Sequence, residues 1–573
     1  MSPGSRLATP VVLWLGLVGR LPAQEVHQHH GETLGRVVFP VSCTPEAQTR
    51  FERAVALLHS FWYERAADTF REAVVADTAC AMGYWGQAMS LFHPLWTPPT
   101  GADLAAGLAA SERGLALVRT PRERDYLTAI RTYYADYGQR DHTTRLAVYA
   151  EAMDGVRHRH PRDREAAIFY ALSLIALGQA NATDTTFNYQ KRADAILEPL
   201  FKAEPRHPGL AHYLIHTNDA PRLARLGLYA ARHYAEIAPD VPHAQHMPSH
   251  IFTRLGLWND DIASNIRSAA SARTFEDERH LDALWDQRGH AWDYLVYAYL
   301  QQGRDAEAKR VVDEAAAVTA VYPVGSLTNA YALAAIPARH ALERGRWREA
   351  TMLAVRPSPE WRAAEALTHF AHALGAARTG DTAGARSAIS ALDDIERTEG
   401  AAAGAHAYWA GQVRIQRHAA SGWLARTMGD TAEAVRLATT AADLEDVTQK
   451  HPVTPGSLLP ARELLGDLLL ELGRPVEAAR AYAASLVQQP NRARSLFGLA
   501  RASEQAGDLA TARTRYREYL ALMQHSDGAR AELDIARGAL SGRWRPFRHT
   551  RVGAGYPAPC HTPADTSSPL RCP

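Results

Sequence analysis

Two pairs of histidines recur at a fixed interval in this chain. His212 and His216 lie four residues apart, and His246 and His250 repeat the pair 34 residues later. Residues four apart lie on one face of a helix, and imidazole nitrogen is a common ligand of Zn, Cu and Fe. If the two helices are neighbours, the spacing predicts that the four imidazoles converge on one such transition-metal ion.

A third helical segment adds two polar residues to the same pattern. The stretch HAWDYLVYAYL begins with His290 and carries Asp293 three residues later. Either side chain can complete the set of metal ligands or orient one of the imidazoles through a hydrogen bond. Two other interpretations remain open, namely a ligand-binding surface without metal and histidines that only stabilise the fold.

The elements that would position these residues are predicted to be helices. Runs such as QQGRDAEAKRVVDEA, RTGDTAGARSAISAL, TMGDTAEAVRLATTA and ELGRPVEAARAYAASL share a Gly, a turn, and then Ala and larger apolar residues at helical spacing. Gly suits the end of one helix because it adopts a left-handed backbone at little cost. Small Ala side chains allow the next helix to pack closely, so the sequence predicts an all-α fold of helical hairpins.

These runs resemble the tetratricopeptide repeat (TPR), a helix–turn–helix unit of 34 residues. The resemblance implies a solenoid, a right-handed superhelix, interrupted here by irregular inserts. It also implies that first helices line a concave groove, with Pro208 and Pro242 at equivalent repeat starts and the histidine pairs, His290 and Asp293 on groove positions. Such a groove would bind a protein, a peptide or a small ligand.

Other stretches, including HPGLAHYLIH and HMPSHIFTRLGLW, resemble a group of exported bacterial TPR proteins. This resemblance brings no catalytic residues with it. We therefore expect a binding or scaffold protein with a metal centre in its groove. The alternative is a hydrolase or oxidase that uses the same centre, because several imidazoles with an open coordination position can activate water or oxygen.

Four regions are predicted along the chain. Residues 1–23 have the apolar run and small residues of a signal peptide, which indicates a periplasmic or secreted protein. A His-rich segment with the sequence HQHH within residues 24–46 precedes a solenoid over 47–540, and a Pro- and Gly-rich tail over 541–573 is predicted to be disordered. No later stretch is predicted to span a membrane.

Cysteine positions and charge give three further expectations. Cys43 and Cys80 flank the first predicted hairpin, whose ends meet, so they are expected to form a disulfide. The net charge of +1 argues against nucleic acid as a partner. The extra residues around ARTFEDERHLDALWDQRG, between two repeats, are predicted to form a rim or lid over the histidines, or else a solvated connector.

Overall fold

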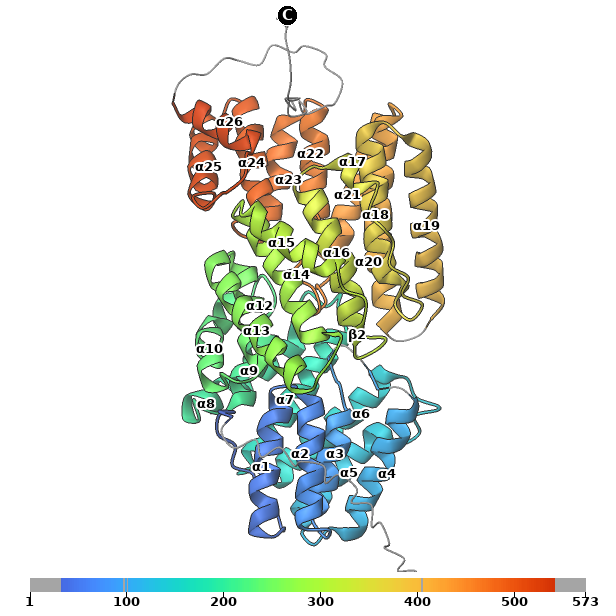
Figure 1. Cartoon of the computed structure of the whole chain (residues 1–573), viewed down its shortest axis with the longest axis vertical. Helices are drawn as coiled ribbons and strands as arrows, with labels where there is room; N and C mark the ends of the chain where they lie inside the picture. Colours follow the sequence, from blue (N-terminus) through green and yellow to red (C-terminus); the bar gives the residue numbers. More distant parts are fainter. Residues whose placement is uncertain (1–31, 96–97, 100, 403–404, 542–573) are drawn as a thin grey trace, which may run out of the picture.

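The computed structural model describes residues 32–95, 98–99, 101–402 and 405–541. The predicted signal peptide, the HQHH motif and the C-terminal tail beyond Ser541 lie outside these residues. Within them, the chain is built almost entirely of helices, arranged as an elongated stack that runs from α1 at one end to α26 at the other (Figure 1). None of the helices in the described residues is long and apolar enough to cross a membrane.

The elements follow one another in this order: α1 (Pro45–His59), α2 (Tyr63–Ala76), α3 (Ala81–Leu91), α4 (Gly101–Leu117), α5 (Pro121–Tyr134), α6 (His142–Arg159), α7 (Arg164–Ala180), α8 (Asn188–Ala203), α9 (Pro208–Asn218), α10 (Ala224–Ile237), α11 (Pro242–His246), α12 (Pro248–Leu255), α13 (Trp258–Glu278), β1 (Leu284–Trp285), α14 (Asp286–Gln301), α15 (Asp305–Ala316), β2 (Val321–Tyr322), α16 (Leu327–Glu343), α17 (Trp347–Ala350), α18 (Arg362–Thr379), α19 (Thr382–Ala401), α20 (Ala405–Thr427), α21 (Thr431–Asp446), α22 (Ala461–Glu471), α23 (Pro475–Gln488), α24 (Ala493–Gln505), α25 (Leu509–Leu522) and α26 (Ala531–Leu540).

The turn within a hairpin follows from two neighbouring residues, Gly and Asp. Gly380 and Gly429 have φ angles of 86° and 88°, a left-handed conformation that ends the first helix. Asp381 and Asp430 come next, and each side chain accepts a hydrogen bond from the backbone N–H of the third residue of the following helix. The Gly residues therefore end one helix, as the sequence predicts, and the Asp side chains start the next.

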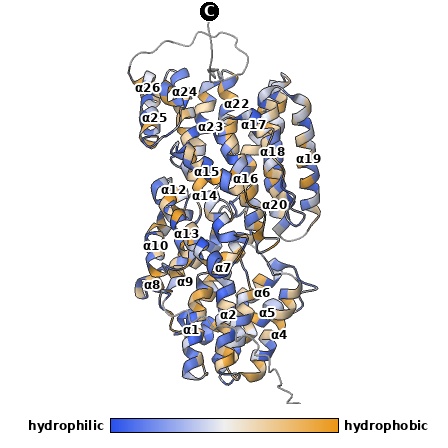
Figure 2. Ribbon diagram, viewed as in Figure 1, coloured by the Kyte–Doolittle hydropathy of each residue, from blue (hydrophilic) through white to orange (hydrophobic). Residues whose placement is uncertain are grey.

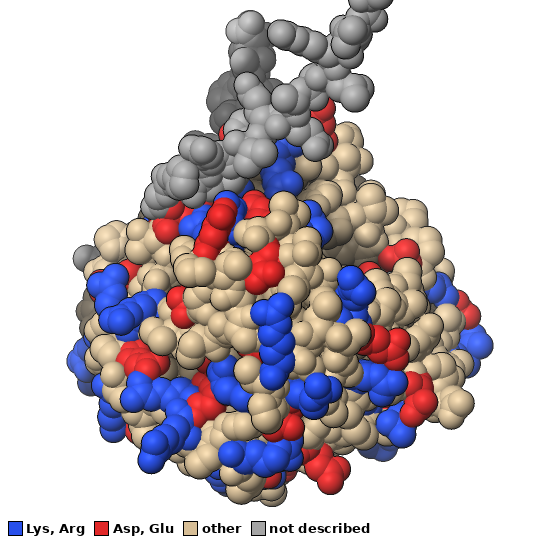
Figure 3. Space-filling model, turned by 90° about the horizontal axis from the view of Figure 1, so that it is seen from below, with Lys and Arg blue, Asp and Glu red and all other residues tan. Residues whose placement is uncertain are grey.

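Each helix packs against its neighbours in the chain, and large apolar cores follow one another along the stack. Apolar residues recur along the visible helices with polar residues between them (Figure 2). Seen from below in Figure 1, acidic and basic side chains are interspersed on the surface, with no broad area of one sign on that face (Figure 3). The fold is thus the all-α hairpin solenoid that the sequence predicts.

The first hairpin is closed by a disulfide between Cys43 and Cys80, which confirms the predicted pairing. Residues 32–44 precede this hairpin and contain neither helix nor strand. They pack on the stack through the fully buried ring of Phe39, and the backbone N–H of Arg36 donates to the carbonyl oxygen of Arg206 at 2.8 Å. The segment therefore belongs to the folded structure.

A loop from the C-terminal half enters the middle of the molecule. We call residues 449–457, between α21 and α22, the inner loop. At one end the backbone N–H of Gln449 donates to the carbonyl oxygen of Ala182 at 2.7 Å. Further along, the Tyr294 hydroxyl donates to the carbonyl oxygen of Thr454 at 3.1 Å. The inner loop thereby joins the two halves of the solenoid.

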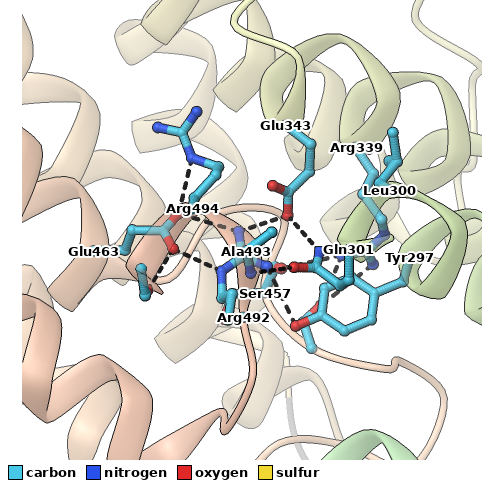
Figure 4. Close-up of polar contacts among 12 residues, drawn as sticks. Tyr297, Leu300, Gln301, Arg339, Glu343, Ser457, Glu463, Arg492, Ala493 and Arg494 are labelled. Atoms are coloured by element: carbon cyan, nitrogen blue, oxygen red, sulfur yellow. Dashed lines mark hydrogen bonds and ion pairs between the residues drawn. The ribbon is translucent and has the colours of Figure 1, made fainter. Parts of the chain in front are cut away.

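A buried ionic network reinforces the same junction. Arg492 bonds Glu463 at 2.8 Å and Glu343 at 2.5 Å, and Gln301 also donates to Glu343 (Figure 4). Figure 4 shows these side chains converging from α14, α16, α22 and the start of α24, beside the ring of Tyr297. Because both charges of the main pair are buried, each needs the other, and the helices that carry them are held in register.

Candidate metal centre

Four helices bring six histidines together in the interior. His212 and His216 come from α9, His243 and His246 from α11, His250 from α12, and His290 from α14. All six side chains are buried. The sequence places five of them at the site, and the structure adds His243.

The helix that carries His246 and His250 is interrupted between them. Pro248 lacks a backbone N–H, so the α-helical ladder breaks at Met247, and α11 and α12 are separate helices. Met247 nevertheless keeps a helical backbone conformation, and the ring centroids of His246 and His250 lie 5.0 Å apart. The predicted one-face arrangement of this pair therefore survives the break.

The ligand atoms fall into two sets of three. Those of His246, His250 and His290 all lie within 4.8 Å of one another, and so do those of His212, His216 and His243. We call these sets the first and the second histidine triad. The sequence predicts one site of four imidazoles, whereas the structure divides those four between two triads because His243 and His290 each add a third nitrogen.

Hydrogen bonds fix which nitrogens of His246 and His250 in the first triad carry protons. Asn265 donates its amide N–H groups to Asp261, so its oxygen accepts from the Nδ1–H of His246 at 2.6 Å. The Nδ1–H of His250 donates to the Asp219 carboxylate at 2.8 Å. A neutral imidazole has one N–H, so both Nε2 atoms carry lone pairs. These two Nε2 atoms face each other at 3.0 Å.

The second triad is oriented in the same way. The Nδ1–H of His212 donates to the carbonyl oxygen of His59 at 2.6 Å, which leaves Nε2 as a buried lone pair that makes no hydrogen bond. Gln287 accepts from the Nδ1–H of His243 at 3.1 Å. Partners outside the triad thus hold the Nδ1 side of His212 and His243, as such partners do around metal-binding histidines.

Burial keeps these imidazoles neutral. Desolvation lowers the pKa of His246, His212 and His290 well below the usual value, and it lowers the pKa of His243 to about 3. Burial also lowers the pKa of His250, although the neighbouring Asp219 carboxylate opposes this effect. A neutral ring offers the lone pair that a metal ion requires.

A small cavity lies between the triads. Its volume is about 20 Å³, and its wall includes His216 and His243 from the second triad and His250 and His290 from the first. The inner loop closes it with Pro452 and Val453. A volume of this size holds about one water molecule.

Asp293 is engaged elsewhere. Its two carboxylate oxygens bond the Arg339 guanidinium at 3.0 and 3.2 Å, and both side chains are fully buried. Arg339 also donates to the carbonyl oxygens of Gly456 and Ser457. The structure therefore places Asp293 in a support for the inner loop, outside both triads.

The segment predicted to form a lid reaches the histidines only at its C-terminal end, where Gln287 accepts from His243 and lines the cavity, and its earlier part lies against α2. Glu278 at the end of α13 bonds Arg65, and Arg279 bonds Asp68 at 2.7 Å. The buried ring of Trp285 packs 4.1 Å from that of Phe275. The inner loop supplies the rest of the cover through Pro452 and Val453. It lies far from the histidines in the sequence, so no local pattern indicates this contact. Because the inner loop lies over them, the predicted groove positions that carry the histidines are buried and do not line an open groove.

A third cluster resembles a metal site in composition but is complete without one. Glu165 accepts from the Nε2–H of both His59 and His207 at 2.9 Å. The other nitrogen of His59 accepts from the Tyr213 hydroxyl, and that of His207 accepts from the backbone N–H of Leu210. Every nitrogen in this cluster has a partner, and the two imidazoles hold the pKa of Glu165 below its usual range despite burial.

Among the six clustered histidines, His243 is the one that the sequence interpretation misses. It does not share the 34-residue offset, and it follows Pro242 at the very start of its helix. Its position three residues before His246 is a helical spacing, so the signal was present but weak.

The stacked helical hairpins form the kind of solenoid that the resemblance to the tetratricopeptide repeat implies. No protein-family model and no curated protein sequence matches it. Among solved structures it is similar to human IFIT1, solved as a dimer with PPP-AAAA, with a TM-score of 0.36, 11% identity, and coverage of 84% of this chain and 91% of that chain. Yeast Tom70 gives a TM-score of 0.31, 10% identity, and coverage of 87% and 96%. Likenesses this weak carry no information about the site.

Proposed function

We propose that this protein is an exported helical-repeat binding protein whose interior holds a transition-metal ion on His246, His250 and His290. The contact between the Nε2 atoms of His246 and His250 carries this proposal. Two lone pairs face each other at 3.0 Å in a buried position, which is unfavourable unless a cation lies against both. A metal ion removes the repulsion by accepting both lone pairs.

A shared proton is the competing explanation for this contact. It would place a positive charge on one ring, and burial disfavours that charge at both His246 and His250. A metal ion gains a third donor from His290, which a proton does not need. The Nδ1 atom of His290 is buried without a hydrogen bond, so its ring has bonding capacity to spare.

The donor set favours copper, zinc or iron. Neutral imidazole suits these ions, whereas Mg²⁺ and Ca²⁺ prefer carboxylate and carbonyl oxygen. Three protein ligands also leave a coordination position open, which is typical of catalytic zinc sites. The cavity beside His250 and His290 has room for a water molecule at that position. This observation supports the second candidate, a metal-dependent hydrolase or oxidase.

The location and the partners are part of the proposal. Disulfides persist in oxidising compartments, so the Cys43–Cys80 bond supports an exported protein. Repeat solenoids commonly act by binding a protein or peptide along their surface. The interspersed charges visible in Figure 3 favour such a partner over nucleic acid.

Metal analysis of the purified protein tests the proposal. The control chain carries Ala at His27, His29 and His30, so that the HQHH motif cannot contribute bound metal. We expect this chain to retain tightly bound Cu, Zn or Fe, and a further His246→Ala, His250→Ala substitution to remove an ion from it. A His158→Ala variant, which changes an exposed histidine on α6, should keep the full content. Equal metal content in the control chain and in its His246→Ala, His250→Ala variant would refute the assignment.

A further inference from the structure

We infer that His212, His216 and His243 form a second metal site beside the first, and that the two ions share one small oxygen ligand. This inference rests on the proposed function for the first triad but uses different ligands. The second triad meets the same criterion, since its three ligand atoms also lie within 4.8 Å of one another. It differs from the Glu165 cluster, which has the same spacing, because the Nε2 atom of His212 makes no hydrogen bond, whereas every nitrogen of the Glu165 cluster has a partner.

The hydrogen bonds around the second triad are those of preoriented ligands. The His59 carbonyl and the Gln287 side chain accept from the Nδ1–H of His212 and His243. The Nε2 lone pair of His212 then points into a fully buried space without a hydrogen-bond partner. A buried acceptor left without a donor is unfavourable, and a bound cation removes that cost by accepting the lone pair.

The two triads are in direct contact. The ring of His216 lies 5.8 Å from that of His250, and the ring of His243 lies 6.1 Å from that of His246, measured between centroids. Within the second triad the rings of His212 and His216 are 4.8 Å apart. The spacing between triads is thus close to the spacing within one, so two bound ions would be near neighbours.

Charge balance indicates what lies between the ions. The six imidazoles bring no negative charge to the site. The Asp219 carboxylate bonds His250, but it also bonds Lys450 at 2.7 Å and Arg254 at 2.8 Å, which offset its charge. Two divalent ions would leave a large positive charge in a buried space, and an anionic ligand between them lowers that cost.

The cavity between the triads matches this ligand in size and position. It has a volume of about 20 Å³, room for about one water molecule, and is lined by two histidines from each triad. A water molecule held by two metal ions loses a proton readily because both ions stabilise the resulting negative charge. We therefore assign a hydroxide-sized oxygen ligand to the cavity.

Metal stoichiometry distinguishes this inference from the proposed function. The chain with the HQHH histidines replaced is loaded with Cu²⁺, freed of excess copper, and analysed for metal. We expect two ions per chain, one ion after His243→Ala, and one ion after His246→Ala, His250→Ala. If the parent binds one ion and His243→Ala still binds that ion, the second site is overturned and the first site stands. No ion in the parent would overturn both.

Electron paramagnetic resonance of the copper-loaded parent chain tests the shared ligand, and the His243→Ala variant serves as its control. Two Cu²⁺ ions joined by one oxygen ligand couple their spins, so the parent chain should show less signal than its copper content. In His243→Ala the remaining ion should give the full signal for its copper. A parent chain with two ions and the full, uncoupled signal would overturn the shared ligand.

Discussion

Replacing Asp293 with Ala should weaken the fold and leave the metal centre intact. The substitution removes a carboxylate that holds the Arg339 guanidinium with two hydrogen bonds, and both side chains are fully buried. The positive charge then remains in the interior without its counter-charge. We expect the free energy of unfolding of the metal-free protein to fall by about 3–5 kcal/mol.

The local structure places the expected loss toward the lower end of that range. Arg339 keeps its hydrogen bonds to the carbonyl oxygens of Gly456 and Ser457, and its guanidinium stays 5.0 Å from the centre of the Tyr297 ring. Figure 4 shows Arg339 beside Tyr297 and Ser457. These contacts partly solvate the charge, so about 3 kcal/mol is the better expectation.

A double variant separates the lost ion pair from the lost volume. Burial raises the pKa of the Asp293 carboxyl even though Arg339 lies against it, so desolvation offsets much of the pair's attraction. Asp293→Ala combined with Arg339→Met removes both charges and should recover at least half of the loss. Urea unfolding of the chelator-treated protein, followed by circular dichroism, measures all three chains.

Metal affinity gives the decisive second readout. If Asp293 oriented a metal ligand, as the sequence suggests, its loss would weaken metal binding by about 10–100-fold. We expect a change of less than about threefold, because both carboxylate oxygens bond Arg339. An unfolding free energy of Asp293→Ala within about 1 kcal/mol of the parent's, together with a large loss of metal affinity, would refute this reasoning.

Two further predictions concern the N-terminal half. Cys43→Ser should lower the unfolding free energy by about 4 kcal/mol in the chain-entropy estimate, since the bond closes a loop with a sequence separation of 37. Free thiols at Cys43 and Cys80 under non-reducing conditions would contradict the disulfide. Glu165→Gln should lower the unfolding free energy by about 3 kcal/mol at neutral pH, because an amide cannot accept hydrogen bonds from both His59 and His207. The lowered pKa of Glu165 means that its contribution is full above its usual pKa and is lost as the pH falls below that value. The variant's thermal midpoint should therefore depend less on pH than the parent's between pH ~6 and ~3, and parallel curves would rule this role out.

The sequence alone determined the local architecture. Gly-Asp pairs such as Gly380-Asp381 end one helix and cap the next through local backbone and side-chain preferences, so the hairpins can be identified without coordinates. The disulfide followed from the same logic, because a hairpin brings its own ends together. Five of the six clustered histidines were identified for a related reason, since a repeat of fixed length places equivalent residues on neighbouring helices.

Only the tertiary structure decided how those histidines are grouped and covered. His243 joins His212 and His216 from another helix, with its ring centroid 4.9 Å from that of His212. Asp293 pairs with Arg339, 46 residues away, and the inner loop reaches the centre from more than 150 residues beyond Tyr294. Contacts across such distances depend on the path of the whole solenoid. Helical periodicity describes one face of one helix, and it carries no information about which distant segment lies against that face.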